Sequence, residues 1–127
     1  MGVGNIARIV SHIAIVLDCA DLDRVGAFWA AALDYPLRQP VTQFLVLAPA
    51  EPDDARPQLI LQRVPEGKVV KNRMHLDLHV PDIAVARDQF LSLGATLLQE
   101  QPNCIGEHCW YLMADPEGNE FCVAMGG

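Results

Sequence analysis

The feature that most constrains the fold of this 127-residue chain is an internal repeat with a period of 61 to 62 residues. Asp82 follows Asp21 by 61 residues and Phe90 follows Phe28 by 62, and each aspartate precedes apolar residues with helical spacing. A carboxylate at such a position caps a helix, because it accepts hydrogen bonds from the first helical turn. The repeat therefore predicts that one plan of secondary structure is used twice.

The first half of the chain predicts a strand, a helix and two further strands. Its apolar residues follow the two-residue period of a strand and then the spacing of a helix, which Pro36 ends. A Pro- and Asp-rich stretch before the last strand is typical of a hairpin loop. The predicted strands are residues 9–17, 44–47 and 58–63, the helix is residues 22–33 and the loop is residues 49–57.

The second half predicts the same order with one more strand. Its helix follows Asp82 and ends at Gly94, because glycine readily takes the left-handed conformation after a helix. Its last two strands are joined by the turn Asp-Pro-Glu-Gly-Asn at residues 115–119. The predicted strands are residues 74–80, 96–100, 109–113 and 120–123.

These elements predict an α+β fold of two βαβββ modules, whose strands form a cupped mixed β-sheet with the helices on the outside. Residues 7–63 form the first module, residues 64–73 a linker and residues 74–125 the second module, within a single domain of residues 1–127. The sequence leaves open whether the cup closes within one chain or between two.

Charge and hydropathy restrict the partners of the chain. Its formal charge of −7 opposes binding to nucleic acid, and its one basic cluster is typical of a solvated loop. No stretch approaches 18 uncharged apolar residues, so no membrane partner is expected. The basic cluster is Lys68, Lys71 and Arg73.

The N-terminal region contains no pattern typical of a signal peptide, which favours a cytoplasmic location. In that compartment the cysteines are expected to be reduced. Their irregular spacing matches neither a zinc knuckle nor a disulfide framework. The four cysteines are Cys19, Cys104, Cys109 and Cys122.

Several short motifs, taken in order, resemble the vicinal oxygen chelate superfamily of glyoxalases, bleomycin-resistance proteins and dioxygenases, and above all its glyoxalase-like domain branch. The resemblance covers almost the whole chain and implies the fold of that superfamily, a small-molecule ligand and a homodimer. The motifs are residues 21–24 with Phe28 and Trp29, residues 64–68, residues 75–78 with Pro81 and Asp82, residues 93–95 and residues 115–121.

In metal-dependent members of that superfamily, four strands each supply one ligand to a divalent ion that chelates two adjacent substrate oxygens. The corresponding positions here are Ala14, Gln62, His75 and Cys122. Alanine cannot ligate, and His12 on the same strand face would need a bulge to replace it. The resemblance thus implies His75, Gln62 and Cys122 as metal ligands of an incomplete site. Zinc or iron would suit it, but the missing ligand favours a site without a metal.

The predicted strand at residues 74–80 has one apolar face and one polar face, and the polar face carries His75, Asp77 and His79. Asp77 could orient His75 and fix its tautomer, so these two residues are predicted as a catalytic acid–base pair even without a metal. An ordinary solvated sheet face is the alternative.

Further side chains are predicted to line the ligand pocket because alternation places them toward the cup. Trp110 is favoured over its neighbour Tyr111, since only one of the two can face inward, and large aromatic rings stack on planar ligands. The predicted substrate-binding residues are Gln62, His79, Trp110, Glu120 and His12.

Two functions follow from this resemblance. The first is an enzyme, a lyase, isomerase or dioxygenase that acts on a substrate with adjacent oxygens, and His75 favours it. The second is a non-catalytic protein of the bleomycin-resistance type that binds a planar or cationic drug or metabolite. The acidity of the chain and the missing ligand at Ala14 favour the second.

Overall fold

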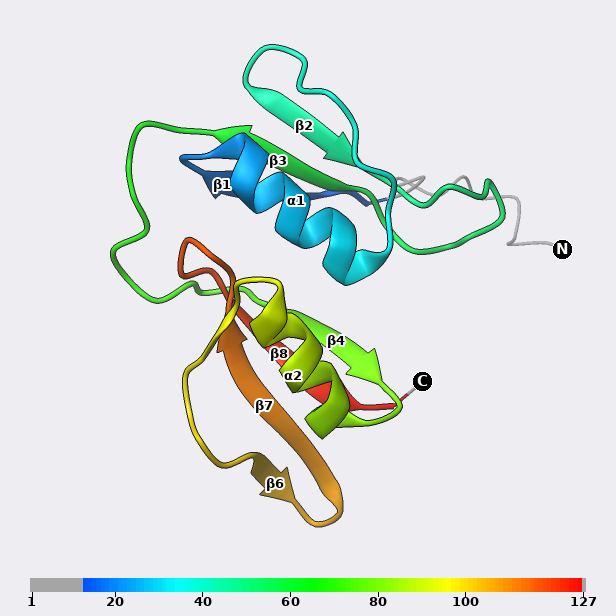
Figure 1. The fold of residues 1–127 in the computed structure, drawn as a ribbon, viewed down its shortest axis with the longest axis vertical. Coiled ribbons are helices and arrows are strands. Elements are labelled where there is room, and N and C mark those ends of the chain that lie inside the picture. Colours follow the sequence, from blue (N-terminus) through cyan, green and yellow to red (C-terminus); the bar gives the residue numbers. More distant parts are fainter. Residues whose placement is uncertain (1–12, 127) are drawn as a thin grey trace, which may run out of the picture.

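The computed structural model describes residues 13–126, which form two β-sheets with one helix packed against each (Figure 1). The first module contributes β1, α1, β2 and β3, and the second contributes β4, α2, β5, β6, β7 and β8. Their bounds are β1 Ile15–Cys19, α1 Leu22–Leu33, β2 Phe44–Leu47, β3 Leu59–Arg63, β4 Leu76–Val80, α2 Ile83–Ser92, β5 Thr96–Leu97, β6 Asn103–Ile105, β7 His108–Ala114 and β8 Glu120–Met125.

The two sheets share one topology. In the first sheet the order is β1-β3-β2, with β1 parallel and β2 antiparallel to β3. In the second sheet the order is β4-β8-β7-β5, with β4 parallel and β7 antiparallel to β8, and β6 also pairs with β7. Each module therefore places its first strand beside its last one, which confirms the repeat seen in the sequence.

Both helices begin where the sequence predicts. The Asp21 carboxylate accepts a hydrogen bond from the Arg24 amide at 3.1 Å, and the Asp82 carboxylate accepts bonds from the Ala84 and Val85 amides. Gly94 follows the second helix with a φ of 109°, a conformation that favours glycine. Helix capping thus fixes the start of each helix, as expected.

Several strand predictions need correction. The first strand runs over Ile15–Cys19 rather than residues 9–17, and residues 9–12 lie outside the described part. The fourth strand begins at Leu76 rather than residue 74. The strand predicted at residues 96–100 leaves the sheet after Leu97, and Asn103–Ile105 form a strand that was not predicted. Three residues are too few for a two-residue period to be recognised.

The prediction that all four cysteines are reduced is also wrong. Cys104 and Cys109 form a disulfide across the hairpin of β6 and β7, whereas Cys19 and Cys122 are free and buried. The sequence could not reveal this pairing, because β6 itself was not recognised and its register against β7 was therefore unknown.

One hydrophobic core joins the two modules. The ring centroids of Phe28 and Trp29 on α1 lie 6.0 and 5.4 Å from that of Phe121 on β8, and Phe90 on α2 lies 5.6 Å from the same ring. Trp29 is only 1% exposed, as its position on the predicted apolar stripe implied. The helices of both modules are therefore held against one shared aromatic cluster.

The turn at residues 115–119 also ties the second module to α1. The buried Asp115 carboxylate accepts hydrogen bonds from the Trp29 indole, from the Asn119 side chain and from the Glu117 and Asn119 amides. The Glu117 carboxylate accepts bonds of 2.7 Å from the Ala20 and Asp21 amides, just before α1. Much of the Asp-Pro-Glu-Gly-Asn motif is thus explained by contacts between the modules.

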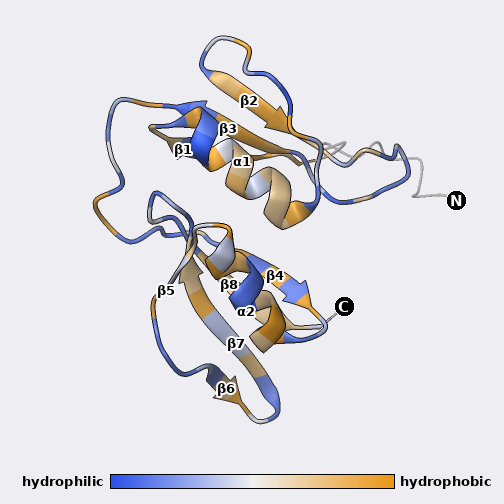
Figure 2. Ribbon diagram, viewed as in Figure 1, coloured by the Kyte–Doolittle hydropathy of each residue, from blue (hydrophilic) through white to orange (hydrophobic). Residues whose placement is uncertain are grey.

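Each sheet has a face that no helix of residues 13–126 covers. In the first sheet this face carries Val16 and Val46, which are 54% and 42% exposed, and β2 is apolar along its length (Figure 2).

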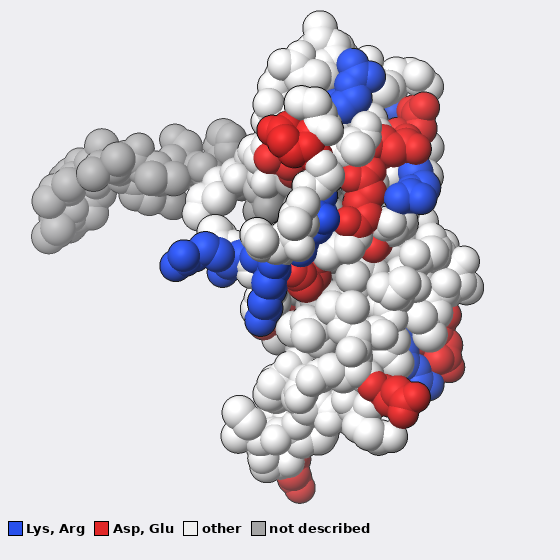
Figure 3. Space-filling view, turned by 90° about the vertical axis from the view of Figure 1, so that its left-hand side faces the viewer, with Lys and Arg blue, Asp and Glu red and all other residues white. Residues whose placement is uncertain are grey.

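Charged side chains gather over the first module and the linker, while the part built by the second sheet shows few in the same view (Figure 3). Within residues 13–126, β1 and β4 each pair with a strand on one side only.

None of the helices in the described residues has the length and apolar character needed to cross a membrane.

Candidate functional site

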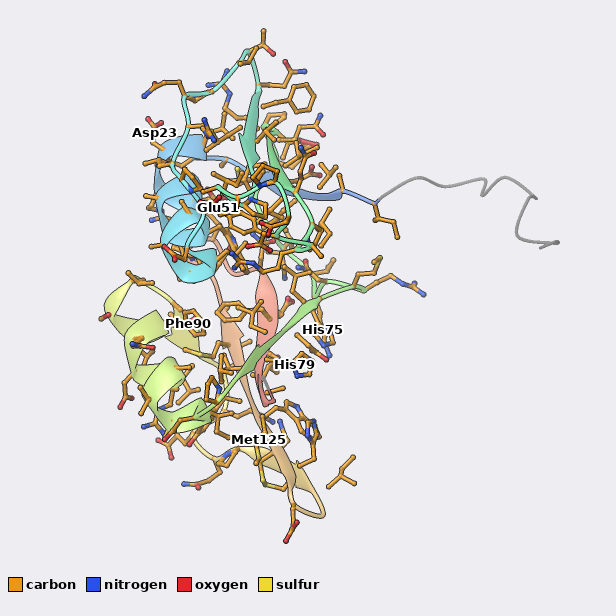
Figure 4. The ribbon with its side chains drawn as sticks, turned by 90° about the vertical axis from the view of Figure 1, so that its right-hand side faces the viewer. Asp23, Glu51, His75, His79, Phe90 and Met125 are labelled. Carbon is orange, nitrogen blue, oxygen red and sulfur yellow. A yellow bond between two sulfur atoms is a disulfide. The ribbon has the colours of Figure 1, made fainter. Side chains whose placement is uncertain are left out.

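The predicted site residues on β4 lie on the open face of the second sheet. Leu76, Leu78 and Val80 are half-buried beneath α2, because side chains alternate along a strand. His75 and His79 point to the opposite side, away from α2 and from the position of Phe90 (Figure 4). The sequence prediction that this strand has one apolar face and one polar face is thus confirmed.

Strand register brings other predicted residues onto the same face. Asp77 lies directly beside Cys122 of β8, and Cys122 in turn lies opposite Leu112 of β7. One row further along, His79 lies beside Ala124, which lies opposite Trp110. The open face therefore consists of parallel rows that each combine a polar side chain from β4 with apolar ones from β7.

His75, Asp77 and Cys122 form a compact cluster. The His75 Nε2 atom lies 3.3 Å from the Asp77 Oδ1 atom, and the ligand atoms of all three residues lie within 4.8 Å of one another. The side chains of His75 and Asp77 are 45% and 54% exposed, whereas Cys122 is buried. A substrate could thus approach the imidazole and the carboxylate directly from solvent, with the thiol beneath them.

The environment of Cys122 keeps its thiol protonated in the absence of a metal. Burial raises the pKa of Cys122, and the charge of Asp77 and a hydrogen bond to its carboxylate raise it further, against a smaller lowering by Lys71. A thiol in such surroundings is a poor nucleophile. Cys122 therefore suits ligation or packing better than covalent catalysis.

The donor set fits a divalent ion of the zinc type. Catalytic zinc sites use three nitrogen, oxygen or sulfur ligands and leave a fourth position for water or substrate. Ligand atoms around one zinc ion lie about 3.5 Å apart, as follows from bonds of about 2.0–2.3 Å in a tetrahedron. The separation of His75 and Asp77 already matches this value, and the exposed side chains can rotate toward Cys122.

The structure places the remaining predicted ligand elsewhere. Gln62 lies on β3 in the first sheet, between Asp18 of β1 and Phe44 of β2, so it belongs to a different sheet from the His75 cluster. His12 lies outside the described residues. The sequence interpretation grouped His75 with Gln62 and Cys122, and it missed that Asp77 can be a ligand beside them. Side-chain alternation had placed Asp77 and His75 on one face as an acid–base pair, but it did not identify the carboxylate as a possible ligand.

Glu120 is on the expected face but already has partners. Its carboxylate lies 3.0 Å from the Lys68 Nζ atom and accepts a hydrogen bond of 2.9 Å from the Asn72 amide. Burial would raise the pKa of Glu120, but these two contacts outweigh it and lower the pKa. Glu120 thus holds the linker against the second sheet, and its role in ligand binding stays a prediction.

Trp110 lies on the open face, as favoured from the sequence, while Tyr111 is buried beneath α2. Its ring centroid lies 5.7 Å from that of His108, two residues earlier on the same strand face. The two rings form an aromatic ledge at one end of the face, next to the row that contains His79.

A cleft of about 400 Å³ opens between the two modules beside this face. Asp77 and His79 contribute to its lining together with apolar side chains from both modules, among them Ile15, Leu59 and Phe90. This largely apolar cleft runs along β4, which also carries the open face, and could hold the non-reacting part of a small molecule.

Comparisons with known proteins agree with this arrangement. A family model described as "Glyoxalase-like domain" matches residues 14–124. No curated protein gives a match.

Solved structures share the fold at low sequence identity. A hypothetical protein from S. aureus superposes with a TM-score of 0.72 at 13% identity, over 94% of this chain and 96% of that one. A glyoxalase/bleomycin resistance protein/dioxygenase family enzyme from Burkholderia phytofirmans gives 0.68 at 16%, over 88% and 95%. A mutant fosfomycin resistance protein, FosX, from Listeria monocytogenes, complexed with Mn(II) and 1S,2S-dihydroxypropylphosphonic acid, gives 0.72 at 15%, over 94% and 93%.

The repeated topology, the open polar face and the family model lead to one conclusion, that this chain belongs to the glyoxalase-like domain family of the vicinal oxygen chelate superfamily.

Proposed function

We propose that this protein is a metal-dependent enzyme, a lyase, isomerase or dioxygenase, that acts on a small molecule with adjacent oxygens at the open face of the second sheet. The observation that carries the proposal is the cluster of His75, Asp77 and Cys122. A divalent ion held there would act as a Lewis acid toward the two oxygens. The complex of FosX with Mn(II) and a dihydroxy ligand supports this class of substrate.

The protein side chains would then bind and orient the substrate. His75 and Asp77 present their polar atoms to solvent, where a substrate can reach them, and Asp77 limits the orientation of the imidazole through their contact of 3.3 Å. Trp110 and His108 offer an aromatic surface for a planar substrate, and the adjacent cleft accepts its apolar part. His79 lies on the same face and would contact the substrate.

Metal binding is the first test. Chelator-treated protein titrated with zinc in a calorimeter should bind one ion per chain. The variants His75→Ala, Asp77→Ala and Cys122→Ala should each weaken binding by at least about tenfold, because each removes one of three ligands. His79→Ala is the matched control: it lies on the same strand face, is absent from the cluster, and should bind zinc like the wild type.

Substrate binding is the second test. Cobalt(II) can replace zinc, and its visible spectrum should change when catechol, a ligand with adjacent oxygens, is added to the loaded protein. A wild type that binds no divalent ion, or a His79→Ala variant that loses the ion as completely as His75→Ala, would contradict the proposed site.

The second candidate is a non-catalytic protein that binds a planar or cationic molecule. The favouring observation is the open, aromatic-edged face beside an apolar cleft, in a chain with a charge of −7. Metal-free protein would then gain thermal stability from a panel of planar cations, and His75→Ala would retain that gain. Stabilisation that requires the divalent ion would favour the enzyme instead.

We also propose that the protein is a homodimer in the cytoplasm and that the cup closes between two chains. Within residues 13–126, β1 and β4 each keep an unpaired edge, and the open face of the first sheet carries the exposed Val16 and Val46. A two-fold axis could pair the first sheet of one copy with the second sheet of the other. The partner's Gln62 would then face the cluster on this chain.

Light scattering tests the dimer, with a mass of twice 13.9 kDa expected. Val16→Lys should shift the protein to a monomer by adding a charge to the proposed interface, whereas Val85→Lys, equally exposed on α2 at 54%, should not. A monomeric wild type would contradict closure between chains but would leave the metal site untouched, so the two proposals fail separately.

A further inference from the structure

The hairpin of β6 and β7 carries a cysteine pair that the proposed function does not use. Cys104 lies directly opposite Cys109 in the antiparallel register, and the two form a disulfide. The hairpin turns at Gly106, whose φ of 61° is in the left-handed region. The bond therefore links two neighbouring strands that the backbone already holds in place.

The two sulfur atoms differ in their access to solvent. Cys104 is exposed on the edge strand, and Cys109 is half-buried on β7. The other two cysteines, Cys19 and Cys122, are buried, and burial together with nearby carboxylates raises the pKa of Cys19 to about 11. Cys104 is thus the most exposed of the four cysteines, and a dissolved thiol can approach this side of the disulfide without prior unfolding.

Opening this bond would cost the fold less than opening one that closes a long loop. The two cysteines are five residues apart, and the entropy that the unfolded chain gains on loss of a disulfide falls as the loop becomes shorter. β6 has three residues and pairs with β7 alone. In the described part of the chain no other strand pairs with β6, and the modules are joined elsewhere, through Phe121 and Asp115.

We propose that Cys104 and Cys109 form a reversible thiol–disulfide site whose substrates are low-molecular-weight thiols and disulfides of the glutathione class. Exposed disulfides are typical of labile and regulatory bonds rather than structural ones. This site lies apart from the metal cluster and does not depend on it.

The exchange proceeds in two balanced steps. A thiolate RS⁻ attacks the Cys104 sulfur, the S–S bond breaks, and Cys109 leaves as a thiolate that takes a proton from solvent. A second RS⁻ then attacks the RS sulfur of the mixed disulfide, which releases RSSR and the Cys104 thiolate, protonated in turn. In sum the disulfide and two RSH give two cysteine thiols and RSSR, and oxidation is the reverse.

Reduction would also alter the aromatic ledge. His108 and Trp110 flank Cys109 and stack at 5.7 Å on the open face, and both pair with residues of β6, His108 with Ile105 and Trp110 with Asn103. Without the bond, β6 is held in place only by the pairing of its three residues with β7. The amides of Asn103 to Ile105 should then exchange faster with solvent.

The test is a redox titration of the full chain. Folded protein is equilibrated with mixtures of reduced and oxidised glutathione, quenched with acid and labelled with a maleimide for mass spectrometry. We expect Cys104 and Cys109 to interconvert together with a single midpoint, while the labelling of the free cysteines Cys19 and Cys122 stays the same at every ratio and serves as the internal control. Hydrogen exchange at residues 103–105 should rise on reduction.

Single-cysteine variants identify the attacked sulfur. With oxidised glutathione, Cys109→Ser should accumulate a mixed disulfide at Cys104 about tenfold faster than Cys104→Ser does at Cys109, because exposure governs access. Circular dichroism should show both variants folded. A pair that stays oxidised in excess reduced glutathione, a pair that stays reduced throughout, or equal rates in the two variants would overturn the proposal.

Discussion

At the scale of single residues, buried carboxylates in this protein connect distant segments of the chain through hydrogen bonds and an ion pair. Asp115 is 1% exposed and accepts hydrogen bonds from three residues, including Trp29 in the other module. Glu120 is likewise buried and holds Lys68 and the Asn72 amide of the linker. The Asp115 carboxylate satisfies donors that would otherwise be buried without partners, and the Glu120 carboxylate is itself satisfied by two partly buried donors.

Asp115→Ala should therefore destabilise the fold by about 3 kcal/mol, because it leaves the Trp29 indole and the Asn119 amide without acceptors in the interior. Urea unfolding followed by fluorescence measures the change. Asp53→Ala, in an exposed loop, is the control and should lie within about 0.5 kcal/mol of the wild type. Equal losses for the two variants would contradict this account of the turn.

The contact between Lys68 and Glu120 predicts a pH-dependent stability. Lys68→Met should lose about 2 kcal/mol at pH 7, because a buried carboxylate loses a charged partner. The folded pKa of Glu120 lies below its unfolded value, so this stabilisation is present above the ordinary glutamate pKa and is lost as the pH falls through the lower folded pKa.

The measurement is urea unfolding of metal-free protein between pH 3 and pH 7. The difference between the wild type and Lys68→Met should shrink toward acid pH, whereas Lys71→Met, exposed on the same linker, should show little difference at any pH. A difference that grows on acidification would mean that another group is responsible.

At the scale of elements, close packing explains a glycine within α1. A Cβ atom added at Gly26 would lie 2.3 Å from Leu45 Cδ2 on β2, so the helix approaches the first sheet through a position that has no side chain. Both helices show the same relation to their sheets, with buried residues on one stripe and a capping aspartate at the start. The close approach at Gly26 sets how deeply α1 sits on β2.

Gly26→Ala should destabilise the protein by about 1–3 kcal/mol through overpacking, although alanine favours a helix interior by about 1 kcal/mol over glycine. Thermal unfolding measures the change, and Gly67→Ala, with no atom within 4 Å of the added Cβ, should be neutral. If Leu45 is the obstacle, adding Leu45→Ala to Gly26→Ala should cost less than Leu45→Ala costs alone.

At the scale of the whole molecule, the two modules should unfold together. The aromatic cluster of Phe28, Trp29, Phe90 and Phe121 draws on both helices and on β8, so neither module retains its core without the other. Cooperative unfolding in one step is the expected consequence of a shared core.

Phe121→Ala should remove about 3–5 kcal/mol, because it opens a cavity where three aromatic rings meet. Circular dichroism in the far ultraviolet and the combined fluorescence of Trp29 and Trp110 should still report coincident transitions in both proteins. Two separate transitions, with only the second module affected, would show that the modules are independent.

How much of this architecture the sequence predicts depends on the range of the interactions. The repeat, the capping aspartates and the apolar stripes predicted both helices and most strands, because these signals lie within a few residues of one another. The two-residue period also placed His75, Asp77 and His79 on one face. The strand β6 was missed because three residues carry no recognisable period.

The candidate site and the disulfide depend on contacts between distant parts of the chain. Cys122 lies beside Asp77 because of the register of β4 against β8. Gln62 lies in the other sheet because β3 pairs with β1. Likewise the pairing of Cys104 with Cys109 follows from the register of β6 against β7. The sequence by itself determined the elements and their faces through local periodicity, and only the tertiary structure decided which faces and which side chains meet, because strand register is fixed by packing across the whole molecule.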